Sequence, residues 1–228
     1  MHRADLAKQF VCSAMERGYH VSIVDGGSPD EFLKAVHGYG ASLLVDSHLN
    51  MMQSRLNAYH MACDTSRPVV NWSEPEKEPY VKEMHKPAKI ILEGTSHLVL
   101  PKRKSLESYS EFQRGQEEIA NRDWNILTGR DDDPWFGPRT ASNAVMKKYF
   151  AAYDGKCNDQ WVIYVPVLNA IKDGLFVASI YVDYTHPQIQ TSDEKDDEQM
   201  KVKRVAQYGN YVRALERWSH ENLLAKFR

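Results

Sequence analysis

Short apolar runs alternate with amphipathic stretches of helical spacing through the first 100 residues of this chain. The runs at 20–24, 40–45, 67–72 and 95–100 have the length and composition of buried strands. The stretches between and before them, at 4–17, 29–37, 50–63 and 79–89, carry apolar residues on one helical face. Because strands that alternate with helices pack as a sheet covered by helices, the sequence predicts an α/β fold with a mostly parallel sheet.

The remainder of the chain is richer in helix. We expect helices at 108–124, 141–153 and 159–174, a strand at 175–184, and a long C-terminal helix at 200–227. The segment 128–138, with many Asp, Gly and Pro residues, and the polar segment 190–199 are predicted to be loops. A chain of 228 residues fits a single domain, 1–228.

Charge and cysteine content exclude several classes of protein. A formal net charge of −2 offers no general attraction to nucleic acid or to an anionic membrane. No apolar stretch approaches the roughly 20 residues that span a bilayer, and the N-terminus lacks a signal-peptide pattern, so a cytoplasmic location is predicted. Cys12, Cys63 and Cys157 are far apart, which argues against a disulfide framework and against a cysteine zinc site.

Two of the predicted strands end in acidic residues. Asp25, Gly26, Gly27 and Ser28 follow the first strand, and Glu74-Pro75-Glu76 follows the third. Ligands of open α/β sheets bind beyond the carboxyl ends of the strands, so these residues suggest a site for a ribose, a metal-bound diphosphate, or both. The alternatives are a turn in which Asp25 caps the following helix, and an acidic loop beside Lys77.

The order of these elements resembles a family-2-type nucleotide-diphospho-sugar glycosyltransferase with the GT-A fold. The resemblance implies that Asp25, Gly26, Gly27 and Ser28 hold the nucleoside. It implies that Glu74 and Glu76 bind a divalent metal, Mn²⁺ or Mg²⁺, together with the donor diphosphate. Arg55, in a helix that lies before the metal-binding strand, is then a candidate diphosphate contact, and Trp72 is a candidate donor contact.

The resemblance continues in the second half of the chain. The loop with Asp131, Asp132 and Asp133 is similar to the one that supplies the general base in inverting members, and the sequence does not choose among the three. The alternative is an exposed acidic turn. Arg139 follows in a segment that is expected to receive an anion. His186, at the end of the last predicted strand, is a candidate third metal ligand or simply a polar residue at a strand end.

The same resemblance divides the domain by role. It implies a nucleotide- and metal-binding half at about 1–100, an acceptor-binding half at 101–190, and a C-terminal loop and helix at 191–228. Residues 201–204 and Gln207 are expected to line or cover the site. The aromatic residues of the C-terminal helix fit either packing on the chain's own core or a homo-oligomer contact.

The sequence departs from this family in two respects. A typical member has a strand before the first helix that forms part of the nucleoside pocket, and none is expected here. The acidic element also carries Glu rather than Asp. Three hypotheses follow: a metal-dependent, inverting glycosyltransferase; a catalytically inactive GT-A-like binding or scaffold protein; and a nucleotidyltransferase, which ranks last because no glycine-rich phosphate loop is present.

Overall fold

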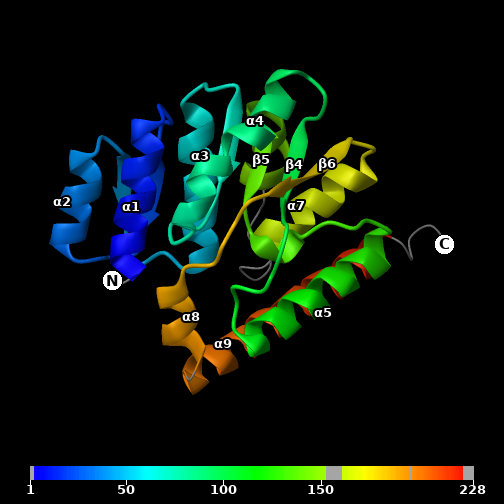
Figure 1. The fold of residues 1–228 in the computed structure, drawn as a ribbon. Coiled ribbons are helices and arrows are strands. Elements are labelled where there is room, and N and C mark those ends of the chain that lie inside the picture. The colour runs from blue at the N-terminus through cyan, green and yellow to red at the C-terminus, as the bar shows by residue number, and fades with distance from the viewer. Residues whose placement is uncertain (1–2, 153–160, 196, 223–228) are drawn as a thin grey trace.

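The computed structural model describes residues 3–152, 161–195 and 197–222 and confirms the α/β class (Figure 1). In this part of the chain the strands are β1 (Ser22–Asp25), β2 (Ser42–Val45), β3 (Val69–Trp72), β4 (Leu98–Arg103), β5 (Arg139–Ser142) and β6 (Val177–Val182). The longer helices are α1 (Arg3–Glu16), α2 (Asp30–Gly38), α3 (Met51–Asp64), α4 (His85–Leu92), α5 (Glu111–Thr128), α7 (Trp161–Lys172), α8 (Gln188–Lys195) and α9 (Glu198–Asn222). Shorter helical turns are η1 (Glu78–Glu83), η2 (Pro134–Phe136), α6 (Asn143–Val145) and η3 (Met146–Ala151).

The strands form two separate sheets rather than one mostly parallel sheet. β1 and β2 pair in parallel as a two-stranded sheet. The other sheet has the order β3-β5-β4-β6, in which β5 is antiparallel to both of its neighbours and β4 is parallel to β6. The prediction of a mostly parallel sheet is therefore wrong for this larger sheet. Among the described strands, none pairs with both β1 and β3 to join the two sheets.

Strand β5 explains the mixed sheet and was missed in the sequence, where 141–153 was predicted as helix. Its four residues are followed at once by α6, whose N-cap is Ser142, the last residue of the strand. A strand this short shows no recognisable alternation, and its helical neighbour dominates the local pattern. Thr140 and Ala141 are nevertheless buried, because β5 pairs on both sides.

A second correction concerns the polar segment predicted as a loop at 190–199. Most of it belongs to the helices α8 and α9. The backbone of α8 starts directly after Pro187, whose carbonyl accepts hydrogen bonds from the amides of Gln190 and Thr191. Gln190 is buried, so one face of this polar helix packs on the protein.

The long helix α9 packs against α5 and α7 (Figure 1). The hydroxyl of Tyr211 donates to the carbonyl of Ala120 at 2.9 Å, and the indole nitrogen of Trp218 donates to Asn169 Oδ1 at 2.8 Å. Tyr211, Leu215 and Trp218 are buried in the main core. The aromatic face of this helix therefore packs within its own chain, the first of the two alternatives that the sequence left open.

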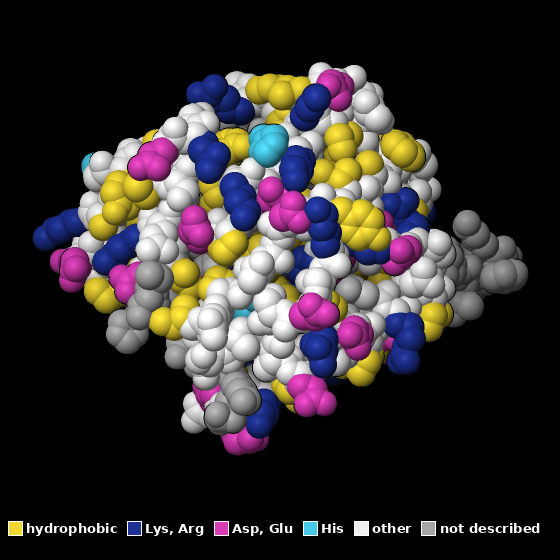
Figure 2. Space-filling view, viewed as in Figure 1, with side chains coloured by type: hydrophobic (Ala, Val, Ile, Leu, Met, Phe, Trp, Pro, Cys, Tyr) yellow, Lys and Arg dark blue, Asp and Glu magenta, His cyan; other side chains and the backbone are white. Residues whose placement is uncertain are grey.

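The surface visible in Figure 2 carries Lys and Arg side chains interspersed with Asp and Glu. No large area of a single charge stands out on that face, in keeping with the small net charge. Among the described helices, none combines the length and the apolar character that a membrane span requires.

Candidate functional site

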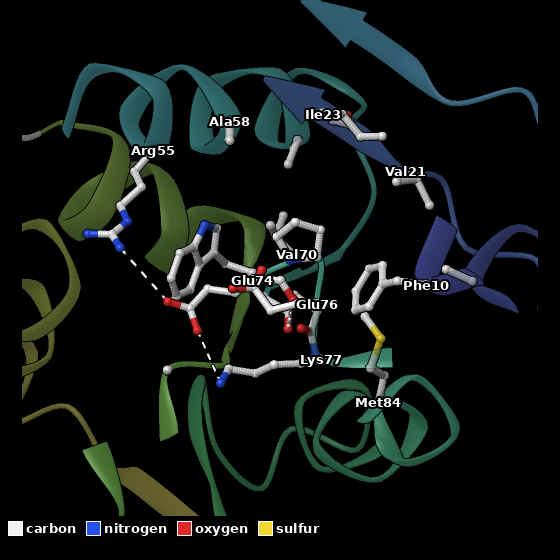
Figure 3. A pocket seen from close by; sticks show the side chains of 18 of the residues that line it. Phe10, Val21, Ile23, Arg55, Ala58, Val70, Glu74, Glu76, Lys77 and Met84 are labelled. Carbon is white, nitrogen blue, oxygen red and sulfur yellow. Dashed lines mark hydrogen bonds and ion pairs between the residues drawn. The ribbon is translucent and has the colours of Figure 1, made fainter. Parts of the chain in front are cut away.

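A cavity of about 660 Å³ lies between β1 and β3 (Figure 3). One end is apolar, with Val21, Ile23 and Phe10 in its wall, whereas Arg55 and Glu74 lie at the other end. A cavity of this volume is in the range of small-molecule sites. Because it reaches the carboxyl end of β3, the polar end lies where the strand-end argument predicts a ligand.

Glu74 is the centre of the charged end. Its Oε2 lies 3.1 Å from Lys77 Nζ, and its Oε1 lies 3.9 Å from Arg55 Nη2. Burial alone would raise the pKa of Glu74, but the charges of Lys77 and Arg55 outweigh it and lower this pKa to about 2. Burial would likewise lower the pKa of Lys77, whereas the carboxylate of Glu74 raises it. Glu74 and Lys77 therefore both carry their charges near neutral pH.

Local chain geometry brings these groups together. Glu74 and Lys77 are three residues apart in a turn that the amide of Lys77 closes by donating to the carbonyl of Glu74 at 3.1 Å. Gly137 has a φ of +102°, and a β-carbon there would lie only 3.3 Å from Glu74 Oε2. Position 137 therefore favours glycine for two reasons. Its backbone conformation has a positive φ, and the loop approaches the Glu74 carboxylate closely.

Further cations come from α9. Lys203 and Arg204 line the same cavity, as does Gln207, in agreement with the prediction that this part of the C-terminal helix lines the site. The charge of Arg204 also contributes to the lowered pKa of Glu74. Lys77 was not among the predicted donor-binding residues, although its spacing of three residues from Glu74 was a signal in the sequence. It adjoins the aromatic rings of Phe136 and Tyr184, at 5.3 Å and 5.9 Å.

Asp25 stabilises a turn, one of the alternatives that the sequence left open, and does not line the cavity. Its carboxylate accepts hydrogen bonds from the amides of Gly27 and Ser28, at 2.8 Å and 2.6 Å, and from the Ser28 hydroxyl at 2.8 Å. The N-cap position of α2 is Pro29, and no side chain caps this helix. Along β1 the last residue that lines the cavity is Val24. Residues 25–28, Gly26 among them, lie outside the lining.

Asp132 and Asp133 make structural contacts within the protein, so the structure gives no support to the prediction of a general base here. Asp133 accepts from Arg103 Nε at 2.7 Å and from Asn121 at 2.8 Å. Asp132 accepts from Arg130 Nε at 2.7 Å, and Ser179 and Trp124 add further hydrogen bonds. Burial alone would raise the pKa of both carboxyls, but these partners lower it.

Asp131 is the exposed member of this loop, with 84% of its side chain accessible and a salt bridge to Lys102 at 2.6 Å. None of the three carboxylates lines the cavity. A buried carboxylate with a lowered pKa is also a poor proton acceptor at neutral pH. The loop with Asp131, Asp132 and Asp133 therefore lies apart from the cavity in its described contacts.

Arg139 is fully buried and also acts within the protein. Its guanidinium donates to the carbonyls of Pro134, Gly137 and Pro138 at 2.7 to 2.9 Å. It braces the loop that approaches Glu74 instead of facing the cavity. Trp72, by contrast, does line the cavity, and Arg55 lies 5.7 Å from its ring centroid.

The predicted metal ligands do not form a three-ligand site. His186 lines the cavity but is buried and stacked on Tyr109, with ring centroids 4.2 Å apart. Within residues 3–152, 161–195 and 197–222, no group of three His, Cys, Asp or Glu side chains is arranged to hold a metal ion. Both oxygens of Glu74 face cations, so the group that would bind Mn²⁺ or Mg²⁺ is already neutralised.

No family model matches the chain, and neither does any curated protein.

Proposed function

We propose that the chain is a glycosyltransferase that binds a nucleotide-diphospho-sugar in the cavity between β1 and β3. The observation that carries the proposal is the convergence of Arg55, Lys77 and Arg204 on Glu74 at one end of that cavity, with Lys203 also in the cavity lining. Charge-assisted hydrogen bonds from such groups are the usual means of binding phosphate. The order of the sequence elements and the α/β class are in keeping with the proposal.

In this proposal the cations perform the role that the family resemblance assigns to a metal. Negative charge develops on the diphosphate as the bond to the sugar breaks. Preorganised cations that adjoin the leaving group stabilise that charge. Because the ligand set does not fit a metal, no step in this scheme requires one.

The base comes from the carboxylates that line the cavity. Glu74 is held by Lys77 and Arg55, and Glu117 is held by Arg103. Glu76 follows the strand end and points into the cavity in Figure 3. We assign to Glu76 the removal of the proton from the acceptor hydroxyl, on the side of the sugar opposite the diphosphate, with inversion at the anomeric carbon.

Thermal unfolding with UDP and with GDP, each with EDTA and with Mn²⁺, tests donor binding. A diphosphate at a hundred times its Kd stabilises the folded state by about 2.7 kcal/mol, which raises Tm by several degrees. We expect this shift with EDTA present, its loss in Lys77→Met, and its recovery in Lys77→Arg. Lys104→Met, which removes an exposed cation outside the cavity, should bind normally. No shift with either nucleotide would overturn the proposal.

One observation favours a second function, that of an inactive binding or scaffold protein. The sheet is divided beside the cavity, and a divided sheet leaves the nucleoside side of the pocket incomplete. The two functions differ in turnover. If neither UDP nor GDP raises Tm, and UDP-sugars and GDP-sugars are neither transferred nor hydrolysed, the scaffold function is the correct one.

A further inference from the structure

The inner part of the cavity is bounded on two sides by strand edges. We call this part the interstrand slot; residues 21–24 form one edge and residues 69–72 the other. β1 pairs only with β2, and β3 pairs only with β5. Each strand therefore turns one edge toward the slot, and no described strand pairs with either edge.

The hydrogen-bond register shows which main-chain groups face the slot. In β1, the carbonyls of Val21 and Asp25 accept from the amides of Ser42 and Asp46 on the β2 side. Because main-chain groups alternate along a strand, those of Ser22 and Val24 point the opposite way, into the slot.

The same reasoning applies to β3. The carbonyl of Pro68 accepts from the amide of Asn143, which fixes residues 68, 70 and 72 as the ones bonded to β5. The amides and carbonyls of Val69 and Asn71 then face the slot. Two rows of main-chain donors and acceptors thus line opposite sides of one cavity.

The remaining walls are apolar helix faces. α3 contributes Ala58 and Ala62, whereas α1 and the start of α4 contribute Phe10, Val11 and Met84. Figure 3 shows Ala58 and Met84 on opposite sides of the cavity. All four residues 21–24 are only partly buried, although a strand between two layers of helices is normally buried on both faces.

We propose that the interstrand slot binds an extended apolar segment of another polypeptide, which adds a strand and joins the two sheets into one. Only an extended main chain can satisfy both rows of donors and acceptors, and the apolar walls select side chains such as Val and Ile. A four-residue strand is about 13 Å long, which matches the four-residue edges. A second copy of this chain fits less well, since each described strand is already paired in its own sheet. This proposal does not depend on the proposed function.

The test uses an acetylated and amidated peptide of five alternating valine and isoleucine residues flanked by lysines. Hydrogen exchange of the full chain is measured with and without the peptide. We expect slower exchange at the amides of Ser22, Val24, Val69 and Asn71, while Ile23, already bonded to β2, changes little. Protection at other sites only, or no protection, overturns the proposal.

A matched control separates strand addition from general apolar binding. The same peptide with alternate amides N-methylated keeps its side chains but loses the main-chain donors toward one of the two edges, so we expect about tenfold weaker binding. Val24→Pro removes a donor from the slot edge and should weaken binding similarly, whereas Val24→Ala should not. Equal affinity for both peptides overturns the proposal, even if the proline variant fails to fold. Protection of the four amides in a dimer without peptide would assign the slot to a second copy and overturn it as well. None of these measurements requires a nucleotide.

Discussion

At the scale of single residues, the molecule depends on a few buried charges that are held by specific partners. The guanidinium of Arg103 is completely buried and contacts both Asp133 and Glu117. Arg103 Nε lies 2.7 Å from Asp133, and the main-chain amide of Arg103 donates to the same carboxylate at 3.1 Å. The positive charge of Arg103 thus compensates the buried negative charges of Asp133 and Glu117.

Replacement of Arg103 by methionine should therefore strongly destabilise the fold. Arg103→Met retains much of the volume but leaves Asp133 and Glu117 buried without their cation, a loss of about 3–5 kcal/mol. Urea unfolding followed by circular dichroism measures it. In the control Lys104→Met, only an exposed salt bridge to Asp183 is lost, and stability should change by less than about 1 kcal/mol. Equal losses in the two variants would contradict the structural role of Arg103.

At the scale of elements, local sequence signals explain where α3 and α5 begin and where α5 ends. α3 begins with a capping box, in which the Asn50 side chain accepts from the amide of Gln53 and the Gln53 side chain accepts from the amide of Asn50. α5 begins at the N-cap Ser110 and ends at Gly129, which has a φ of +68°. These residues position the two helices independently of the site between them.

The two glycines of α5 provide a matched pair of substitutions with opposite expected signs. Gly129→Ala forces a β-carbon into the left-handed region and should destabilise the protein by about 1–2 kcal/mol. Gly115→Ala lies within the helix, where a β-carbon meets nothing within 4 Å, and should stabilise by about 0.5–1 kcal/mol. Thermal and urea unfolding of both variants measure the changes. The same sign for both would refute this account of the helix end.

At the scale of the whole molecule, the described chain has two cores and two sheets. The larger core, with Trp124, Phe150 and Tyr211, lies among the four-stranded sheet, α7 and α9. The smaller core joins α1 and α2 to Tyr80 in η1 and to Phe136 in η2. The proposed site lies where these two parts meet, so its geometry depends on contacts far apart in the sequence.

The acid sensitivity of the molecule follows from the carboxyls whose pKa is lowered by folding. Glu74 has a pKa of about 2, and Asp132 and Asp133 are also lowered by their cationic and hydrogen-bonding partners. Their contribution to stability is complete above the unfolded values, near pH 4, and is lost as the pH falls through the folded values. We expect the urea midpoint to be flat from about pH 7 to pH 5 and to decline below about pH 4.

The variant Glu74→Gln serves as the comparison for this pH profile. It removes one of the titrating groups, so its decline below about pH 4 should be shallower than that of the parent protein. A midpoint that stays constant to about pH 3 in the parent protein would contradict the lowered pKa values of these carboxyls.

The sequence by itself determined the α/β class, most of the helices and the position of the acidic strand ends, because these depend on local periodicity and on capping and turn residues. It also placed Arg55, Glu74 and α9 near one site. Only the tertiary structure decided that β5 is a strand, since four residues carry too little pattern without their neighbours β3 and β4. The contacts of Asp133 and Arg139 were likewise decided by the tertiary structure. The sequence shows that these side chains are charged, but their burial and their partners depend on how the chain folds.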